Sequence, residues 1–125
     1  MKRNNICVID YGIGNLLSVS RALERCNSKV KVTSNSNEIL KASHVVLPGV
    51  GAFINGMKEL KSRGLDKIVR EIAQRGTYLL AICLGMQLLL EESEEFGITK
   101  GLGLIKGRVV PVPTIAIGGS PQKIP

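Results

Sequence analysis

The stretch from Tyr78 to Leu90 constrains the fold of this chain most, because a strand pattern meets a helix pattern there at a cysteine. Five apolar or aromatic residues, YLLAI, precede Cys83 and are enough for a buried parallel strand, while the residues after it have the pattern of a helix. Such an abrupt turn strains the backbone and needs small neighbours, which Ala81 and Gly85 supply. The sequence therefore predicts an elbow that lifts the Cys83 sulfur clear of the sheet edge.

The position of Cys83 before a helix also favours reactivity. The macrodipole of the following helix stabilises a thiolate at its amino end, and the thiolate is the nucleophilic form. A packing role is the alternative, since cysteine is among the most buried residue types. We keep the packing interpretation for Cys7 and Cys26, which lack the small neighbours and the strand-to-helix switch.

Length and composition limit the class of protein. The chain has 125 residues, 44% of them hydrophobic, which suffices for one modest core and so for one domain or part of one. Its apolar runs fall well short of the ~18 residues of a membrane span, and its first residues lead into a strand, so we expect a cytoplasmic protein. The three cysteines lack CxxC spacing, which argues for reduced thiols and against a disulfide framework or a zinc site. We expect neither a metal nor a cofactor.

The net charge of +7 does not by itself indicate nucleic-acid binding. Only 3% of the residues are aromatic, so platforms for base stacking are scarce. An acidic protein partner is the favoured use of the charge. The main basic cluster alternates with apolar residues at helical spacing, as on a solvated helix face, and consists of Lys58, Lys61, Arg63, Lys67 and Arg70.

Strand and helix patterns alternate along the chain. We expect helices from Asn15, a plausible N-cap, to Cys26 and over 37–42. A third helix carries Phe53, Met57 and Leu60 on one face, and a fourth runs through Leu65, Ile68 and Ile72. The expected strands are 6–9, 30–33, 45–47 and 78–82. Strands separated by helices predict an α/β fold, a three-layer, doubly wound, mostly parallel sheet. In such sheets the chemistry collects beyond the carboxyl ends of the strands.

Three loops leave these carboxyl ends. The first, 10–16, does not complete a dinucleotide fingerprint, because the third glycine would fall at Leu17. The second brackets Val50 with glycines, which is equally compatible with an ordinary turn and with amides that converge on an anion. The third is the elbow, where the amide of Leu84 would point to the same place. Amides from two loops beside a thiolate predict an oxyanion hole for acyl transfer.

Four motifs together resemble the class I glutamine amidotransferases, in order and at family-like spacing between about Ile6 and Val110. They are DYGIGNL from Asp10, LPGVGAF from Leu47, AICLGMQLL from Ala81 and GLGLI from Gly101. Within the family the chain looks like the glutaminase subunits that serve histidine biosynthesis. The resemblance implies a flavodoxin-like fold and the hydrolysis of glutamine to glutamate and ammonia through a thioester on Cys83. It further implies a heterodimer with a cyclase subunit that receives the ammonia through a channel.

The resemblance also implies roles for particular residues. Val50, Gly51 and Leu84 would lie at the oxyanion site, Gln87 and Glu95 would hold the amino-acid end of glutamine, and Asn15 would lie on the partner interface or ammonia path. From the residues alone, Glu95 could equally be one of several solvated acids between Glu91 and Glu95.

The chain departs from the family pattern in two respects. Ala81 stands where glycine is common, at a modest steric cost. The family's catalytic histidine and glutamate, which lie late in the chain, are also missing here. The one histidine, His44, is at the start of a strand, whereas the chemistry is expected beyond the end of that strand. Three residues at ~3.3 Å each separate them, which places His44 about 10 Å from the chemistry. We therefore expect residues 1–125 to be the amino-terminal part of one amidotransferase domain, inactive alone, with connecting segments from Gly97 onwards and over 111–125 in particular.

Two other functions remain open at this point. One is a homologous glutaminase that supplies ammonia for the amidation of surface-polysaccharide sugars, with the same chemistry and a different synthase partner. The other is a non-catalytic, flavodoxin-like binding module in which Cys83 is inert or senses redox state.

Overall fold

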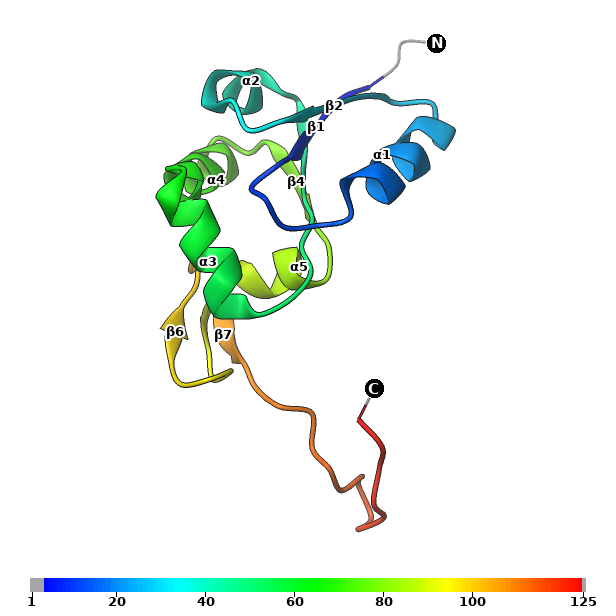
Figure 1. Ribbon diagram of the computed structural model, residues 1–125, viewed down its shortest axis with the longest axis vertical. Helices are drawn as coiled ribbons and strands as arrows, with labels where there is room; N and C mark the ends of the chain where they lie inside the picture. Colours follow the sequence, from blue (N-terminus) through cyan, green and yellow to red (C-terminus); the bar gives the residue numbers. More distant parts are fainter. Residues whose placement is uncertain (1–3, 125) are drawn as a thin grey trace.

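Four strands form one parallel sheet in the computed structural model, which describes residues 4–124 (Figure 1). The sheet order is β2-β1-β3-β4, so the chain starts in the middle of the sheet and winds outwards in both directions. This topology confirms the predicted α/β fold with a parallel sheet. The strands are β1 (Asn5–Ile9), β2 (Lys29–Thr33), β3 (His44–Leu47) and β4 (Tyr78–Ala81).

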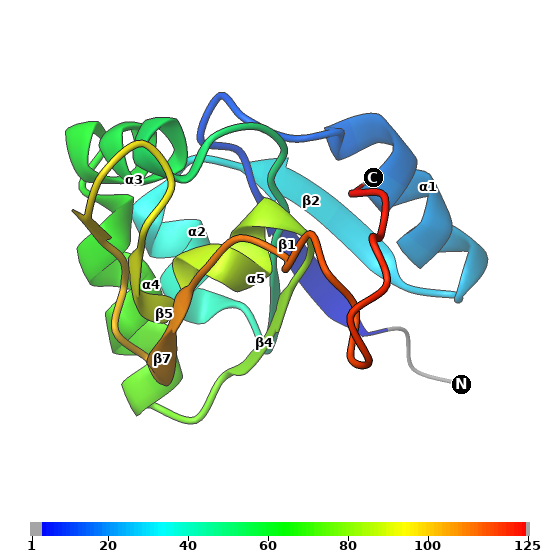
Figure 2. The same ribbon diagram turned by 90° about the horizontal axis from the view of Figure 1, so that it is seen from below.

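Helices lie on both faces of this sheet, as Figure 2 shows in a view from below. Of the helices within residues 4–124, α1 (Leu16–Arg25) is the one that packs against one face, where Ile6, Val8 and Val46 form a small cluster. The opposite face carries the larger core, to which four helices contribute: α2 (Ser36–Lys41), α3 (Phe53–Ser62), α4 (Leu65–Gln74) and α5 (Leu84–Leu88). No helix within residues 4–124 combines the length and the apolar character needed to cross a bilayer.

The helices form where side-chain spacing and capping favour them. Asn15 caps α1 by accepting a hydrogen bond from the Ser18 N–H at 3.3 Å, which confirms the predicted N-cap. On α3, Phe53, Met57 and Leu60 are fully or almost fully buried along one face, as predicted. On α1, Leu16, Val19 and Leu23 pack against the small cluster, so apolar spacing aligns both helices with the sheet.

Strand β4 differs from its prediction as a strand buried on both faces. Tyr78 is 72% exposed and Leu80 is 54% exposed, whereas Leu79 and Ala81 on the other side pack against the larger core. The reason is that β4 lies at the edge of the sheet, and α1 covers only the strands further in. An apolar run alone therefore did not distinguish a central strand from an edge strand.

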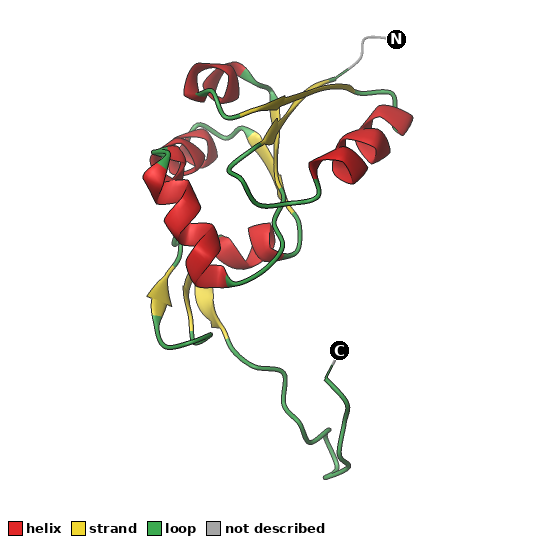
Figure 3. Cartoon of the chain, in the orientation of Figure 1, coloured by secondary structure: helices red, strands yellow, loops and turns green. Residues whose placement is uncertain are grey.

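A second, small sheet follows the elbow, in the order β6-β5-β7. It consists of β5 (Leu90–Ser93), β6 (Thr99–Lys100) and β7 (Ile105–Val109), so the prediction of connecting segments from Gly97 onwards is wrong for β6 and β7. The glycines after Gly97 do form turns, but these turns connect short strands. Beyond β7, Figure 3 shows the chain as loop. The only β-bridge within the described part of that segment joins Ile115 and Pro121.

The two cysteines assigned to packing behave differently. Cys7 lies in β1 and is buried in the larger core, as predicted. Cys26 is exposed, because α1 ends at Arg25 and Cys26 follows as its C-cap. The predicted apolar contact of Cys26 on the helix face is therefore wrong.

Candidate functional site

Cys83 sits on a strained turn between β4 and α5. Its backbone has φ 55° and ψ −119°, a conformation that costs a residue other than glycine about 1–3 kcal/mol. Hydrogen bonds hold the turn from both sides: the Ile82 N–H donates to the Leu47 carbonyl at 3.0 Å, and the Gly85 N–H donates to the Ile82 carbonyl at 2.9 Å. The Cys83 residue is exposed, as the elbow predicts.

Gly85 allows this turn to lie directly against the end of β3, the strand beside β4. A Cβ at this position would lie 2.0 Å from the carbonyl oxygen of Leu47, which is closer than any real contact. The small neighbour predicted after the cysteine is therefore required by backbone packing. Ala81 before it pairs with Leu47 in the sheet and is partly buried, so its methyl group fits.

The loop after β3 approaches the elbow and is anchored by a buried tyrosine. The Tyr11 hydroxyl donates to the Pro48 carbonyl at 2.6 Å, and the Tyr11 side chain has no exposed surface. Burial, with a smaller contribution from the nearby Cys83, raises the pKa of the Tyr11 phenol, so the hydroxyl keeps its proton and stays a donor. A Cβ on Gly49 would lie 2.4 Å from the same hydroxyl oxygen.

Sequence reasoning did not assign a role to Tyr11. The available signal was a lone aromatic residue two positions after a strand, in a loop that contains two glycines. That pattern is too common to identify an anchor without the packing.

The two loops predicted to form an oxyanion hole lie in contact, but the Leu84 amide is occupied. Its N–H donates to the Gly49 carbonyl at 3.3 Å. Val50 is 54% exposed, and Gly51 has φ +98° with open space where a side chain would be. In this conformation the Gly49 carbonyl therefore takes the hydrogen bond that an oxyanion would need.

Gln87 and Glu95 line one pocket of about 240 Å³, together with the end of β7 and the residues after it, Val109, Val110 and Pro111. Glu95 is fixed rather than freely solvated. One of its carboxylate oxygens, Oε1, accepts from the Phe53 N–H at the start of α3 at 3.0 Å, and its own N–H donates to Ser93 Oγ at 3.1 Å. The β7 side of this pocket was missed because β7 was expected to be a connecting segment.

The protein-family model described as Glutamine amidotransferase class-I matches residues 7–122 of the chain. The chain belongs to the class I glutamine amidotransferases. The match includes both loops, the elbow and the pocket residues described above.

Relatives with assigned names support this membership. Subunit HisH of imidazole glycerol phosphate synthase from Geobacillus thermodenitrificans is 51% identical over 96% of this chain and 56% of its own length. HisH from Geobacillus sp. (strain WCH70) is 50% identical over 96% of this chain and 57% of its own length. HisH 1 from Legionella pneumophila (strain Lens) is 46% identical over 98% of this chain and 57% of its own length. This amidotransferase chain thus spans a little over half the length of these relatives.

Solved structures show the same fold at lower identity. A crystal structure of a glutamine amidotransferase aligns with a TM-score of 0.69 at 19% identity, over 82% of this chain and 54% of that one. A putative peptidase E protein from Listeria monocytogenes aligns with a TM-score of 0.64 at 18% identity, over 82% of this chain and 63% of that one.

In this class I amidotransferase, His44 lies far from the elbow. It begins β3 and pairs with Tyr78, the first residue of β4, whereas Cys83 follows the last. The His44 ring stacks on Tyr78 with the ring centres 5.0 Å apart, and its Nδ1 lies 2.8 Å from Ser43 Oγ. His44 is therefore placed for strand packing and not for proton transfer at Cys83.

Helix α5 supports Cys83 less than the sequence suggested. It comprises five residues, Leu84–Leu88, before β5 begins at Leu90. A helix of little more than one turn has a small macrodipole. The site consequently depends on backbone geometry and exposure more than on the helix.

Proposed function

We propose that Cys83 is the nucleophile of a glutaminase and that the described loops form half of its active site. The observation that carries the proposal is the exposed Cys83 on a strained turn, held against the loop that contains Gly49 and Val50. Strain of this kind persists where the surrounding structure enforces it, and it gathers at functional sites.

The chemistry is acyl transfer to sulfur. The Cys83 thiolate adds to the carboxamide carbon of glutamine, the C–N bond breaks, and the nitrogen leaves as ammonia after it takes up a proton. Water then hydrolyses the glutamyl thioester to glutamate and returns the sulfur. Both steps pass through a tetrahedral oxyanion, so both need donors at the carbonyl oxygen.

The oxyanion requires a local rearrangement. The oxygen that accepts from the Leu84 N–H belongs to the peptide that joins Gly49 to Val50. Rotation of that one peptide would release the Leu84 N–H and turn the Val50 N–H toward the sulfur. Gly51 has open space around it, which supports such a movement, and Tyr11 anchors the loop at Pro48.

The amino-acid end of glutamine is assigned to the pocket of Gln87 and Glu95. The carboxylate of Glu95 would accept from the substrate ammonium group, and its hydrogen bond from the Phe53 N–H orients it for this contact. Gln87 provides an amide that can bind the substrate carboxylate.

The relatives support a proposal for the pathway. Identities near 50% over almost the whole chain to HisH subunits support a role as the glutaminase subunit of imidazole glycerol phosphate synthase in histidine biosynthesis. A cytoplasmic location is part of the proposal. A cyclase subunit would receive the ammonia, and Asn15 is proposed to lie on that interface or path. The general base and the acid that protonates ammonia have to come from residues other than His44, so we propose that residues 1–125 form part of an amidotransferase domain and are a poor catalyst by themselves.

Selective labelling of Cys83 tests the proposal. A diazoketone analogue of glutamine is added to the chain, and the modified cysteines are identified by mass spectrometry. We expect Cys83 to react faster than Cys26, although both are exposed, and excess glutamine to slow only Cys83. Iodoacetamide, which lacks the amino-acid end, serves as the control reagent and should discriminate less between the two.

Equal labelling of Cys83 and Cys26 by the glutamine analogue, with no protection by glutamine, would contradict the proposal. A glutaminase assay adds a second readout. The chain alone should release negligible ammonia, whereas a full-length HisH from Geobacillus should lose its activity when its equivalent of Cys83 is replaced by alanine.

A further inference from the structure

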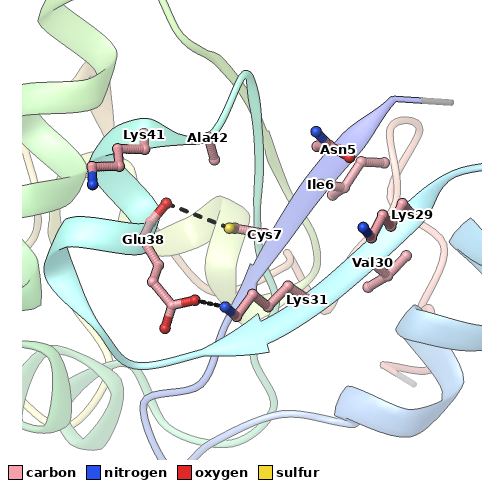
Figure 4. Close-up of a pocket in the computed structure, with 9 residues that line it drawn as sticks. All are labelled: Asn5, Ile6, Cys7, Lys29, Val30, Lys31, Glu38, Lys41 and Ala42. Carbon is pink, nitrogen blue, oxygen red and sulfur yellow. Dashed lines mark hydrogen bonds and ion pairs between the residues drawn. The ribbon is translucent and has the colours of Figure 1, made fainter. Parts of the chain in front are cut away.

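A cleft of about 340 Å³ opens at the end of the sheet opposite Cys83. It lies between α2 and the amino-terminal halves of β1 and β2, and Figure 4 shows the residues that line it. Its volume is within the range of small-molecule sites in proteins. The carboxyl ends of the strands carry the loops of the glutaminase site, so this cleft is not part of that site.

The rim of the cleft carries an excess of positive charge. Lys29 and Lys31 come from β2, and Lys41 comes from the last turn of α2 on the other side (Figure 4). Glu38 is the one acidic residue in the lining, and its carboxylate is already engaged by Lys31 and by Thr33 Oγ1. Within residues 4–124, Lys29 and Lys41 have no ion-pair partner, which leaves two uncompensated charges at the rim.

The inner wall of the cleft is mostly apolar. Cys7 and Ala42 line it, and both pack with the larger core of the sheet. The Cys7 thiol donates to the Glu38 carbonyl at 3.6 Å, and burial raises its pKa, so the thiol stays neutral. A ligand for this cleft needs an apolar body as well as negative charge.

Protection of an edge strand explains only part of this arrangement. Lysines on an edge strand such as β2 discourage pairing with another chain. That role does not require Lys41, which is on a helix, or a hollow between α2 and the sheet.

We propose that this cleft binds a small organic phosphate. Its apolar body would lie against Cys7 and Ala42, and its phosphate would contact the ammonium group of Lys29, which points toward the cleft in Figure 4. The Lys41 side chain points away from the cleft in that view and would turn inward to reach the same phosphate. A dianion matches the two uncompensated lysines better than a monoanion does.

Titration with phenyl phosphate, followed by amide NMR spectra of the ¹⁵N-labelled chain, tests the proposal. We expect saturable shifts at Cys7, Lys29, Lys31 and Ala42, which weaken as salt is added. Inorganic phosphate, with the charge alone, and benzyl alcohol, with the ring alone, should shift these amides far less at equal concentration.

Two variants separate the parts of the cleft. The double substitution Lys29→Gln and Lys41→Gln should weaken phenyl phosphate binding about tenfold. Ala42→Leu keeps the charges and fills the inner wall, so it should abolish binding. The matched control is Lys58→Gln with Lys67→Gln, which removes two exposed lysines from α3 and α4 and should leave binding unchanged.

Three outcomes would overturn the proposal: no saturable shifts at the cleft, an equal response to inorganic phosphate, or an equal loss of binding in the control variant. Either of the last two would mean that phosphate is attracted by surface lysines in general and not bound by the cleft. None of these results depends on the reactivity of Cys83, so the two proposals stand or fall separately.

Discussion

The two faces of the four-stranded sheet differ in how completely helices cover them. One face is packed by α2, α3, α4 and α5, and Ile9 and Leu47 have no exposed surface there. Among the helices that the structure describes, only α1 lies on the other face, and Tyr78 and Leu80 of β4 are largely exposed there. The elbow and the anchored loop both continue into helices of the packed face. The geometry of the site is therefore set by the face that is fully packed, and changes on the two faces should have unequal effects.

The largest expected effect is at the contact between the elbow and the packed face. Gly85→Ala would place a methyl carbon 2.0 Å from the Leu47 carbonyl oxygen, so either α5 or β3 has to move. We expect a loss of about 4 kcal/mol or more in the free energy of unfolding, measured by urea denaturation.

Gly56→Ala on α3 is the matched control for this change. The nearest atoms to its new methyl group would be the side-chain ends of Leu84 and Leu88, at 3.2 Å, and alanine favours the helix. The change should be within about 1 kcal/mol. Similar losses for the two variants would show that backbone contact at the elbow does not limit the fold.

Strand β4 allows the two faces to be compared with one residue type. Leu79 packs against the larger core, whereas its neighbour Leu80 points to the other face and is 54% exposed. Leu79→Ala should cost about 2 kcal/mol and Leu80→Ala less than about 1 kcal/mol. Urea midpoints measured under identical conditions check this order, and the reverse order would mean that the exposed face is covered in solution.

The two tyrosines sharpen the comparison at the level of one hydroxyl group. Tyr11→Phe leaves the Pro48 carbonyl without its buried donor and should cost about 1.5 kcal/mol. Tyr78→Phe, on the exposed face, should cost less than about 0.5 kcal/mol. The Tyr11 variant should also alter the labelling rate of Cys83, because the anchored loop contacts the elbow. An unchanged rate would argue against the anchoring role.

The smallest expected effect is a pH dependence at the rim of the packed face. A hydrogen bond from Lys31, and a second from Thr33, lower the pKa of Glu38 in the folded chain. This contribution to stability is complete above the ordinary carboxyl pKa and is lost as the pH falls through the lowered value. Lys31→Met should therefore flatten the decline in the urea midpoint between about pH 5 and about pH 3. Lys58→Met should leave the slope as in the parent chain.

Periodicity predicted the helices and the strands of the main sheet, because each depends on local spacing. Phe53, Met57 and Leu60 are buried where the pattern of three and four puts them. The same reasoning placed β4 but gave its burial wrongly, since exposure of an edge strand depends on which elements lie beside it. It also failed for β6, which has only two residues, and for β7, whose sequence IKGRV contains no apolar run.

The elbow was predictable from Ala81, Cys83 and Gly85, because small residues around a strand-to-helix switch have one simple explanation. The hydrogen bond from the Leu84 N–H to the Gly49 carbonyl was not, since the orientation of one peptide leaves no trace in the sequence. The anchor from Tyr11 to Pro48 spans 37 residues and appears only when the two loops are packed.

The backbone angles of Cys83 place stability and chemistry in opposition at one position. Glycine would adopt φ 55° without penalty, so Cys83→Gly should yield a sturdier polypeptide that has no sulfur. Random mutagenesis with selection for thermal stability alone would favour that substitution. Engineering that aims at higher thermal stability in this chain should therefore keep Cys83 and substitute other positions.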